Sequence, residues 1–485
     1  MGRARLGVAD GEWTVSTFNA QYKPGLVDGT ASQARFRSPT AVIEVPLEAV
    51  ESQQDVHLKD SSRGPAAAVI VADTQNNVLR CAVISLVGAG GKGSYVKKFA
   101  PSGVWMRPRG MCCVSDGMLV ADSGHHRIRS VSFDGRRVLP FAGCGKKGHK
   151  DGPVLKAMFD NPSAVCVCPS DGSIIVADTG NNALRRIHNG MVTTLAGPGG
   201  GPGEDRHASG LVDGESLAAR FRRPTHVLFD TEESLLVVDS LNHCVRVVAP
   251  DWTEVRTLAG APRLGARDGP VDVAEFHTPE AACVLAGGGL AITDRENNKV
   301  RLLSAGMGEV STLVGTGQWG ALDGPASAAL LNHPTGICAL ASGHLVVCDT
   351  GNNCLRLLTP PRTPKGGGCA AGGWEGSRGR PSVLGANWAG AGTGADLEAS
   401  VREVLESSDE EEALDAFVAG ERAGPESAAE GSLSLLDASR SSAAWGASRN
   451  IKALAGSDPP PEPARLLAGD PAALRRPASA PLRSA

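Results

Sequence analysis

A ten-residue segment recurs six times along the chain, and such internal repetition restricts the fold more than any other sequence feature. Each copy is an apolar run that ends at an aspartate, crosses a short polar turn and resumes as a second apolar run that contains an arginine. This pattern is typical of a β-hairpin. The six copies are V-A-D-T-Q-N-N-V-L-R from Val71, V-A-D-S-G-H-H-R-I-R from Val120, V-A-D-T-G-N-N-A-L-R from Val176, V-V-D-S-L-N-H-C-V-R from Val237, I-T-D-R-E-N-N-K-V-R from Ile292 and V-C-D-T-G-N-N-C-L-R from Val347.

A second motif, D-G-x6-[F/L]-x-x-P, precedes five of the six hairpins with the same internal spacing. It begins at Asp28, Asp151, Asp213, Asp268 and Asp323, and in the second repeat only Pro108 of it remains. The distance from this motif to the hairpin aspartate is 26 or 27 residues, but 45 residues in the first repeat. The first repeat therefore holds an insertion, which we place at residues 46–64 and expect to be a loose loop.

A short apolar strand follows each motif proline, a position where proline removes no hydrogen bond from a β-sheet. Together with the two hairpin strands and a fourth strand, as from Met191, Glu254 and Glu309, this gives four antiparallel strands at a period of about 55 residues. Such units repeated radially are β-propeller blades. The sixth repeat lacks a fourth strand, and residues 14–20 supply one at the start of the chain. We therefore predict an all-β fold, a six-bladed β-propeller over residues 14–360 closed by an N-terminal strand. The outer strand of the first blade, near residues 95–106, is not placed by the sequence.

Residues 361–485 are rich in Ala, Gly, Ser and Pro, and we predict a low-complexity, largely disordered tail. Apolar residues at helical spacing indicate one acidic helix at residues 395–418. Its acidic serine cluster, residues 407–412, is either a docking or phosphorylation segment or a solvated acidic stretch. The net charge of −4 falls on this tail, because Lys plus Arg equals Asp plus Glu in residues 1–360. The neutral ring does not favour bulk attraction to nucleic acid or to anionic membranes.

The 12 cysteines are scattered, and many occupy apolar strand positions without any C-x-x-C pair. This usage favours free, buried thiols in a reducing compartment over a disulfide framework. No apolar stretch approaches the roughly 18 residues of a membrane span. The first residues also lack the apolar segment of a secretory signal. We expect a soluble, cytoplasmic and monomeric propeller that does not associate with membranes.

The six hairpin turns are predicted to serve structure, because an active site is needed once and a turn is needed in every blade. We expect each aspartate to accept hydrogen bonds from backbone N–H groups of its own turn, and the asparagines to tolerate positive φ. Gly180 and Gly351 are expected to relieve the same constraint. The Phe of the Asp-Gly motif is expected to plug the space between neighbouring blades. The predicted structural turn residues are Asp73, Asp122, Asp178, Asp239, Asp294, Asp349, Asn77, Asn182, Asn298 and Asn353.

With these repeats, the chain resembles the NHL-repeat family of six-bladed propellers, whose Asn-His-Leu turn is approached most nearly at Asn242-His243-Cys244. The resemblance covers about residues 14–360. It implies a rigid binding platform, since the family includes protein-binding and RNA-binding propellers of tripartite-motif proteins. One enzymatic branch comprises peptidyl-hydroxyglycine amidating lyases. The chain carries no RING or B-box array, kinase segment or thioredoxin-like C-x-x-C.

Binding loops are expected on the propeller face that carries both the hairpin turns and the connections between blades. The second repeat departs from the others there, with basic residues before, within and after its strands. If these converge, they form an anion-binding patch on the second blade; the alternative is an ordinary solvated surface. The predicted patch residues are Lys97, Lys98, Arg107, His125, His126, Arg127, Lys146, Lys147 and Lys150.

Three functions follow from these observations. The first is a non-enzymatic protein-interaction scaffold that presents ligand-binding loops on one face. The second is binding of RNA or another anionic ligand through the second-blade patch, although few aromatic residues are available for base stacking. The third is a metal-dependent lyase with His226, His277 and His333 as candidate ligands near the propeller axis. We favour the scaffold, with a protein partner and with no catalytic residue, metal or cofactor.

Overall fold

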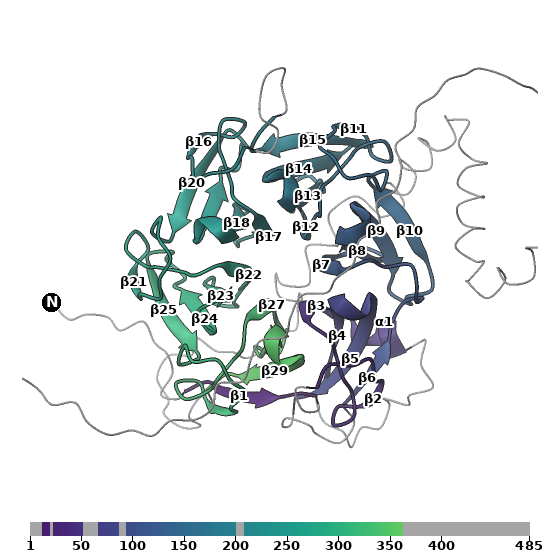
Figure 1. Cartoon of the computed structure of the whole chain (residues 1–485), viewed down its shortest axis with the longest axis vertical. Coiled ribbons are helices and arrows are strands. Elements are labelled where there is room, and N and C mark those ends of the chain that lie inside the picture. Colours follow the sequence, from purple (N-terminus) through teal and green to yellow (C-terminus); the bar gives the residue numbers. More distant parts are fainter. Residues whose placement is uncertain (1–11, 20–22, 52–65, 87–93, 200–207, 362–485) are drawn as a thin grey trace, which may run out of the picture. The chain divides into compact units, whose positions relative to one another are not determined.

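The computed structural model of the protein describes residues 12–19, 23–51, 66–86, 94–199 and 208–361. Within them, the strands form six antiparallel sheets placed around a common axis, which confirms the predicted six-bladed propeller (Figure 1). The predicted disordered tail, with its acidic helix at residues 395–418, lies outside the described residues from residue 362 onward.

Each sheet is one blade, and its strands are named here from the axis outward. Blade 1 consists of β3 (Pro39–Val45), β4 (Ala66–Asp73), β5 (Val78–Ser85), β6 (Tyr95–Lys98) and β2 (Gly29–Thr30). Blade 2 consists of β7 (Pro108–Val114), β8 (Gly117–Asp122), β9 (Arg127–Ser132) and β10 (Val138–Ala142). Blade 3 consists of β12 (Ala164–Val167), β13 (Ile174–Asp178), β14 (Ala183–His188), β15 (Met191–Ala196) and β11 (Gly152–Pro153).

The second half of the ring repeats this order. Blade 4 consists of β17 (Pro224–Phe229), β18 (Leu235–Asp239), β19 (Cys244–Val248), β20 (Glu254–Ala259) and β16 (Gly214–Glu215). Blade 5 consists of β22 (Pro279–Val284), β23 (Leu290–Asp294), β24 (Lys299–Leu303), β25 (Glu309–Val314) and β21 (Gly269–Pro270). Blade 6 consists of β27 (Pro334–Ala339), β28 (Leu345–Asp349), β29 (Cys354–Thr359), β1 (Thr14–Thr17) and β26 (Gly324–Pro325).

The N-terminal strand closes the ring as the sequence predicted. β1 pairs antiparallel with β29, with Thr14 opposite Thr359 and Thr17 opposite Arg356. Thr17 also donates a backbone hydrogen bond of 2.9 Å to Asp323, the aspartate of the Asp-Gly motif of blade 6. The first and last described strands of the chain therefore lie in one sheet, and β29 presents no free edge on this side.

The Asp-Gly motif forms a strand of its own, which the sequence did not reveal. Its glycine begins a two-residue strand that pairs with the outer strand of the same blade, as Gly152 does with Val192. In the described chain, five sheets therefore have five strands, and blade 2, which lacks the motif, has four. The outer strand of blade 1, left unplaced by the sequence, is β6.

The insertion in the first repeat begins with a helix. Its beginning forms the short helix α1 (Leu47–Glu51), which corrects the prediction of a loose loop there; residues 52–65 lie outside the described chain. Leu47 and Val50 stand three positions apart and therefore face the same side of the helix. Val50 is fully buried in the cluster between blades 1 and 2, against which Leu47 packs, so this contact stabilises the turn of helix.

The core consists of six apolar clusters, each built from the facing sides of two neighbouring blades. As predicted, the motif Phe or Leu plugs these interfaces without solvent exposure; the plugs are Phe36, Phe159, Phe221, Phe276 and Leu331. Trp105 stands at the same distance before Pro108 and is buried between blades 1 and 2. Blade 2 therefore keeps its plug, in the form of a tryptophan that the motif pattern missed.

Five of the six hairpin turns are short 3-10 turns, and blade 5 has an ordinary turn in the same place. In all six, the turn is followed by a residue in the left-handed conformation, for example Thr74–Asn76 followed by Asn77 at φ 53°. Positive φ thus falls on the second residue of the predicted Asn pair. Gly180 and Gly351 do not have positive φ, and the role predicted for them is wrong. Glycine is needed there for space, since a Cβ on Gly180 would stand 2.4 Å from the Asp160 carboxyl carbon. We call the side of the ring that carries these turns the turn face.

Candidate functional site

A buried ion pair supports every hairpin turn. In blade 3, Asp178 accepts 2.8 Å hydrogen bonds from Arg185 Nη1 and Asn181 Nδ2, and a 2.7 Å bond from the backbone N–H of Asp160. The aspartate thus accepts hydrogen bonds, as predicted, but from side chains and from a backbone N–H of the preceding connection between blades. The prediction that N–H groups of its own turn are the donors is wrong, and no side chain caps the turn by a hydrogen bond. Burial raises the pKa of Asp178 to about 6, against the opposing effect of Arg185 and these hydrogen bonds.

Hydrogen bonds between neighbouring turns link the blades into a ring. The side chain of the left-handed residue accepts a hydrogen bond from the backbone N–H of the residue before the next blade's proline, as in Arg107 N–H to Asn77 Oδ1 at 2.7 Å. Histidine takes the place of asparagine in blades 2 and 4, where Nδ1 is the acceptor. The contact that closes the ring joins Ser38 to Asn353 at 2.9 Å. These repeated turn residues therefore serve the scaffold, and a functional site must use residues that differ between blades.

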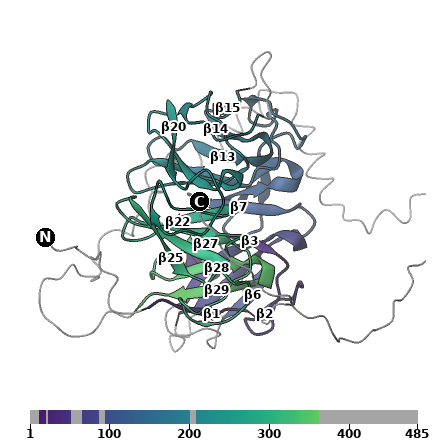
Figure 2. The same cartoon turned by 60° about the vertical axis from the view of Figure 1, so that its left-hand side comes forward.

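Charged residues replace hydroxyl residues at two inner positions of the repeat. The residue after the motif proline is Thr40, Ser163, Thr225 or Thr335 in four blades, but Arg109 in blade 2 and Glu280 in blade 5. The residue after the hairpin aspartate is Thr or Ser in five blades, but Arg295 in blade 5. Arg109 and Glu280 bring charge to the innermost strands β7 and β22, and Arg295 brings it to the hairpin turn of blade 5. The innermost strands surround the axis in Figure 1, and Figure 2 shows β22, β27, β3 and β7 side by side.

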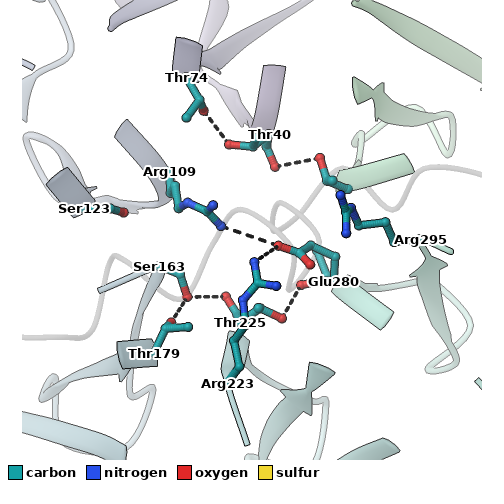
Figure 3. Close-up of polar contacts among 12 residues, drawn as sticks. Thr40, Thr74, Arg109, Ser123, Ser163, Thr179, Arg223, Thr225, Glu280 and Arg295 are labelled. Atoms are coloured by element: carbon teal, nitrogen blue, oxygen red, sulfur yellow. Dashed lines mark hydrogen bonds and ion pairs between the residues drawn. The ribbon is translucent and has the colours of Figure 1, made fainter. Parts of the chain in front are cut away.

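Arginines from three blades gather around the carboxylate of Glu280 at the turn-face end of the axis (Figure 3). Arg109 and Arg223 lie 3.5 Å and 3.8 Å from Glu280 Oε1, and they come from blades 2 and 4. The pKa of Arg109 is lowered by its burial and by the charges of Arg223, Arg107 and Arg295, against the effect of Glu280. We call Arg107, Arg109, Arg223, Arg295 and Glu280 the axial mouth.

The axial mouth carries more positive than negative charge. Arg295 has a carboxylate partner of its own, Glu296, at 2.7 Å, so four guanidinium groups share two carboxylates. The side chains of Arg109, Arg223 and Arg295 are 21%, 35% and 32% exposed, and all three can therefore be reached from solvent. Partly buried guanidinium groups with incomplete pairing are a typical means of holding carboxylates or phosphates.

A cavity of about 40 Å³ lies among the inner strands next to the axial mouth, lined by residues that include Arg109, Ser163, Thr225, His226 and Glu280. Two of its polar atoms, His226 Nδ1 and Glu280 Oε2, are buried without a hydrogen-bond partner. Burial lowers the pKa of His226 to about 4, so the imidazole is neutral at pH 7. The cavity has room for roughly one water molecule and provides both donors and acceptors.

The predicted second-blade patch is distributed over separate parts of the structure. Lys97 and Lys98 lie on β6, an outer strand of blade 1, whereas Arg107 belongs to the axial mouth. His125 and His126 lie in the turn of blade 2, where His125 Nδ1 is 2.9 Å from Asp122 and the pKa of His126 is lowered by burial. Arg127 begins β9. Lys147 lies 3.3 Å from Asp160, and Lys146 and Lys150 flank it in the connection to blade 3. Only Arg107 of these residues belongs to the axial mouth.

The three histidines considered as metal ligands have separate surroundings. His226 lines the cavity, whereas the ring of His277 packs edge-on against His243 at 5.7 Å. His333 lies 3.2 Å from Glu296 through Nε2. Among the described residues, no group of three or more His, Cys, Asp or Glu side chains is arranged to hold a metal ion.

The cysteines of the described ring are present as free thiols. Cys112, Cys166, Cys283 and Cys338 occupy the same position on four inner strands, four residues after the motif proline. Burial raises the pKa of these thiols, to about 12 for Cys283, so they remain protonated at neutral pH. They act here as small packing residues.

Comparison with known proteins finds NHL repeats in this chain and relatives that carry them. The NHL repeat family matches residues 159–187 and 331–356, which fall in blades 3 and 6. Protein SUPPRESSOR OF QUENCHING 1, chloroplastic, of Arabidopsis thaliana is 24% identical over 288 residues, or 56% of this chain and 27% of that protein. NHL repeat-containing protein 2 of Bos taurus is 28% identical over 316 residues, or 58% of this chain and 40% of that protein. The chain thus matches well under half the length of these relatives.

A solved structure shows the same fold at low sequence identity. An auxiliary nutrient binding protein from Bacteroides thetaiotaomicron superposes with a TM-score of 0.52 and 16% identity, over 72% of this chain and 77% of that one. Six sheets around one axis define the protein as a six-bladed β-propeller. Its repeats, the two matched NHL repeats and the relatives support an NHL-repeat propeller family. Within the described residues, no helix has the length and hydrophobicity needed to span a bilayer.

Proposed function

We propose that this propeller is a non-catalytic binding platform that holds an acidic segment of a protein partner at the axial mouth. The observation that carries the proposal is the set of arginines that three blades direct around one carboxylate. A guanidinium group stays protonated in proteins and offers several donors in a fixed plane. It is therefore suited to binding carboxylates, and unsuited to proton transfer or nucleophilic attack at neutral pH.

The composition of the ring supports a local site over a general basic surface. Positive and negative residues balance over residues 1–360, so attraction of an anion depends on where the charges are placed. The axial mouth concentrates arginine at the centre of the turn face. Arg109 lies on the inner strand β7, and the other arginines lie in short turns beside strands rather than on long loops. Rigid placement reduces the entropy lost when a ligand is bound. We expect the partner to contribute clustered Asp or Glu side chains.

The test is the affinity of the full-length chain for a fluorescein-labelled hexaglutamate peptide, measured by fluorescence polarisation. The double variant Arg109→Gln/Arg223→Gln is expected to bind at least tenfold more weakly, which corresponds to about 1.4 kcal/mol. The matched control is Lys97→Gln/Lys98→Gln, which removes the same charge from the outer strand of blade 1 and is expected to change affinity less than twofold. An equal loss of affinity in both double variants would mean that the peptide is attracted by positive charge anywhere on the ring, and would overturn the proposal.

The experiment also decides the alternative of RNA binding. A labelled single-stranded RNA oligonucleotide is measured under the same salt conditions with the same variants, and with Lys146→Gln/Lys147→Gln for the connection between blades 2 and 3. We expect weaker retention of the RNA than of the peptide, because the axial mouth has no aromatic residue on which bases could stack. Tighter binding of RNA, lost in the Lys146/Lys147 variant, would replace the protein-binding proposal by the RNA-binding one.

A further inference from the structure

The ion pair at the axial mouth is looser than the other Arg–carboxylate pairs of the inner ring. In the hairpin turns, the distances from Arg185 to Asp178 and from Arg301 to Asp294 are 2.8 Å and 2.7 Å. Arg109 and Arg223 remain 3.5 Å and 3.8 Å from Glu280, beyond the range of about 2.7–2.9 Å that is typical of a charge-assisted hydrogen bond. The two guanidinium groups therefore retain donor capacity for an external anion.

Glu280 occupies the position where a ligand anion would sit, and its own hydrogen-bonding capacity is incomplete. Its side chain is about nine-tenths buried, at 10% exposure, and Oε2 has no hydrogen-bond partner. The strand that carries it is fixed, because its backbone oxygen accepts a 2.8 Å hydrogen bond from the Thr225 hydroxyl. A buried carboxylate oxygen without a donor costs free energy until a donor reaches it.

We infer that Glu280 determines the specificity of the axial mouth, by rejecting bare anions and accepting an anionic group that also brings an N–H donor. This inference rests on the binding of an acidic segment proposed above. A ligand carboxylate binds Arg109 and Arg223, and a main-chain N–H of the same peptide donates to Glu280 Oε2. An anion without a hydrogen-bond donor is repelled by the negative charge of Glu280, and no hydrogen bond to Glu280 offsets this repulsion. Acidic peptides are thus favoured over sulfate through a repulsive element built into the site.

The repeat supplies the comparison that supports this role. Four other blades have a threonine or serine at the position of Glu280, so the ring itself does not require a carboxylate there. The single carboxylate lies on blade 5 and faces the single arginine at the same position, Arg109, from blade 2 across the axis (Figure 3). Paired departures from the repeat on opposite blades therefore favour a role at the site over a role in folding.

The experiment compares two probes on wild type and on Glu280→Gln: the labelled hexaglutamate peptide, and sodium sulfate as its competitor, with sodium chloride at matched ionic strength as reference. We expect the inhibition constant of sulfate to fall at least tenfold in Glu280→Gln, while the affinity for the peptide changes less than threefold. Equal tightening for both probes would show that Glu280 merely repels anions, and no change in either would show that it does not act at the site. Either result overturns the inference.

A second variant keeps the test decisive if Glu280→Gln fails to fold. Glu280→Thr installs the residue that blades 1, 4 and 6 have at this position, and it is expected to fold and to show the same loss of discrimination against sulfate. If the peptide binds wild type and depends on Arg109 and Arg223, but discrimination is intact in both Glu280 variants, this inference falls and the proposed function stands. If the peptide binds none of these proteins, both fall together.

Discussion

Blade 2 has four strands, whereas each of the five other blades has an additional two-residue strand that begins at the glycine of the Asp-Gly motif. In blade 3, the motif residue Asp151 accepts hydrogen bonds from Arg185 Nη2 and from the backbone N–H of Thr194 on the outer strand. The motif therefore ties the outer strand to the buried arginine. In blade 2, Arg129 approaches its hairpin partner Asp122 through Nε, at 2.7 Å.

The parts that blade 2 shares with the other blades show what every blade needs. A hairpin aspartate paired with an arginine seven residues later occurs in all six repeats, and an aromatic or leucine plug lies beneath it. In blade 2 the plug is Trp105, over whose ring the Arg129 guanidinium lies at 5.9 Å, as Arg185 lies over Phe159 at 5.2 Å. Every blade thus has the aspartate–arginine pair and the apolar plug, and the Asp-Gly motif is added to them in five blades.

The same comparison supports the proposed place of the binding site. Blade 2 departs most from the repeat, and it contributes Arg107 and Arg109 to the axial mouth. Residues shared by the blades build the ring, and residues that differ between equivalent positions form the proposed site. The following changes test this division, beginning with the largest expected loss of stability.

Replacing the buried arginine of a five-stranded blade should cause the largest loss of stability. Arg185→Leu leaves the buried Asp178 without its charged partner, and we expect the free energy of unfolding to fall by about 3–5 kcal/mol. The loss of free energy for Arg129→Leu in blade 2 is expected to lie in the lower part of that range. Blade 2 has no Asp-Gly motif, so this change breaks no contact between the arginine and a motif aspartate. Urea denaturation followed by tryptophan fluorescence measures both.

The matched control is the adjacent residue on the same strand. Arg186 pairs with Asp171 near the surface, with both side chains more than a quarter exposed, so Arg186→Leu is expected to cost less than about 1 kcal/mol. A loss for Arg129→Leu that exceeds the loss for Arg185→Leu would contradict the view that the Asp-Gly motif is an addition to a common pair.

Removing the motif aspartate should have an intermediate effect. Asp151→Ala deletes the acceptor of Thr194 N–H and one partner of Arg185, and its side chain is 42% exposed. Solvent weakens such interactions, and we expect a loss of about 1–2 kcal/mol in the free energy of unfolding. Asp116→Ala in blade 2 is the control, since Asp116 is about half exposed and lies 3.7 Å from Arg137. Equal melting temperatures for the two variants would show that the motif does not stabilise its blade.

The ring was predictable because its information is local and repeated. Hairpin residues close in sequence form the second and third strands of each blade, and the missing fourth strand of repeat six had one partner available, residues 14–17. The Asp-Gly strand was missed because two residues give no periodic signal. The donors to the hairpin aspartates were missed because they come from side chains and from the preceding connection, which turn patterns within the hairpin do not include.

The site was not predictable by the same means. Arg109 and Glu280 are 171 residues apart and meet only because blades 2 and 5 face each other across the axis. The predicted patch grouped residues that are near in sequence, although β6 lies at the outside of the ring and Arg107 at its centre. Alignment of the six repeats against one another would have exposed Arg109, Glu280 and Arg295 as the charged exceptions at hydroxyl positions.

Histidine in the turn of blade 2 should make its contact with blade 3 sensitive to acid. His126 Nδ1 accepts a hydrogen bond from Asn161 N–H at 3.1 Å, which requires the neutral ring, and burial lowers the pKa of His126 below its usual 6.5. The unfolded chain therefore takes up the proton first. The contribution of this contact is complete above pH 6.5, and it is lost as the pH falls through 6.5 towards the folded pKa.

The change His126→Asn installs the residue used by Asn77 and Asn182 at the same position, which does not titrate. The contact is worth about 1 kcal/mol, so the difference in melting temperature between pH 7.5 and pH 5.5 should be smaller in the variant than in wild type. His243 is the other histidine in such a turn, and its pKa is also lowered by burial, so His126→Asn/His243→Asn should reduce the difference further. An unchanged difference in both variants would show that these contacts do not depend on protonation.

The smallest effect is expected at the plug. Trp105→Phe gives blade 2 the plug of its neighbours, and two opposing changes accompany it. The smaller ring leaves unfilled space, while the buried indole N–H, which has no hydrogen-bond partner, is removed. We expect the free energy of unfolding to change by less than about 1 kcal/mol, because the two contributions are similar in size.

The control for this change is Phe159→Leu, which gives blade 3 the plug that blade 6 has in Leu331 and should cost less than about 1.5 kcal/mol. Both are measured by thermal unfolding at one pH. A loss above about 2 kcal/mol for Trp105→Phe would mean that the space between blades 1 and 2 has been shaped around tryptophan. Blade 2 would then differ from the others in its core as well as at its edge, and the common unit of the ring would be reduced to the aspartate–arginine pair.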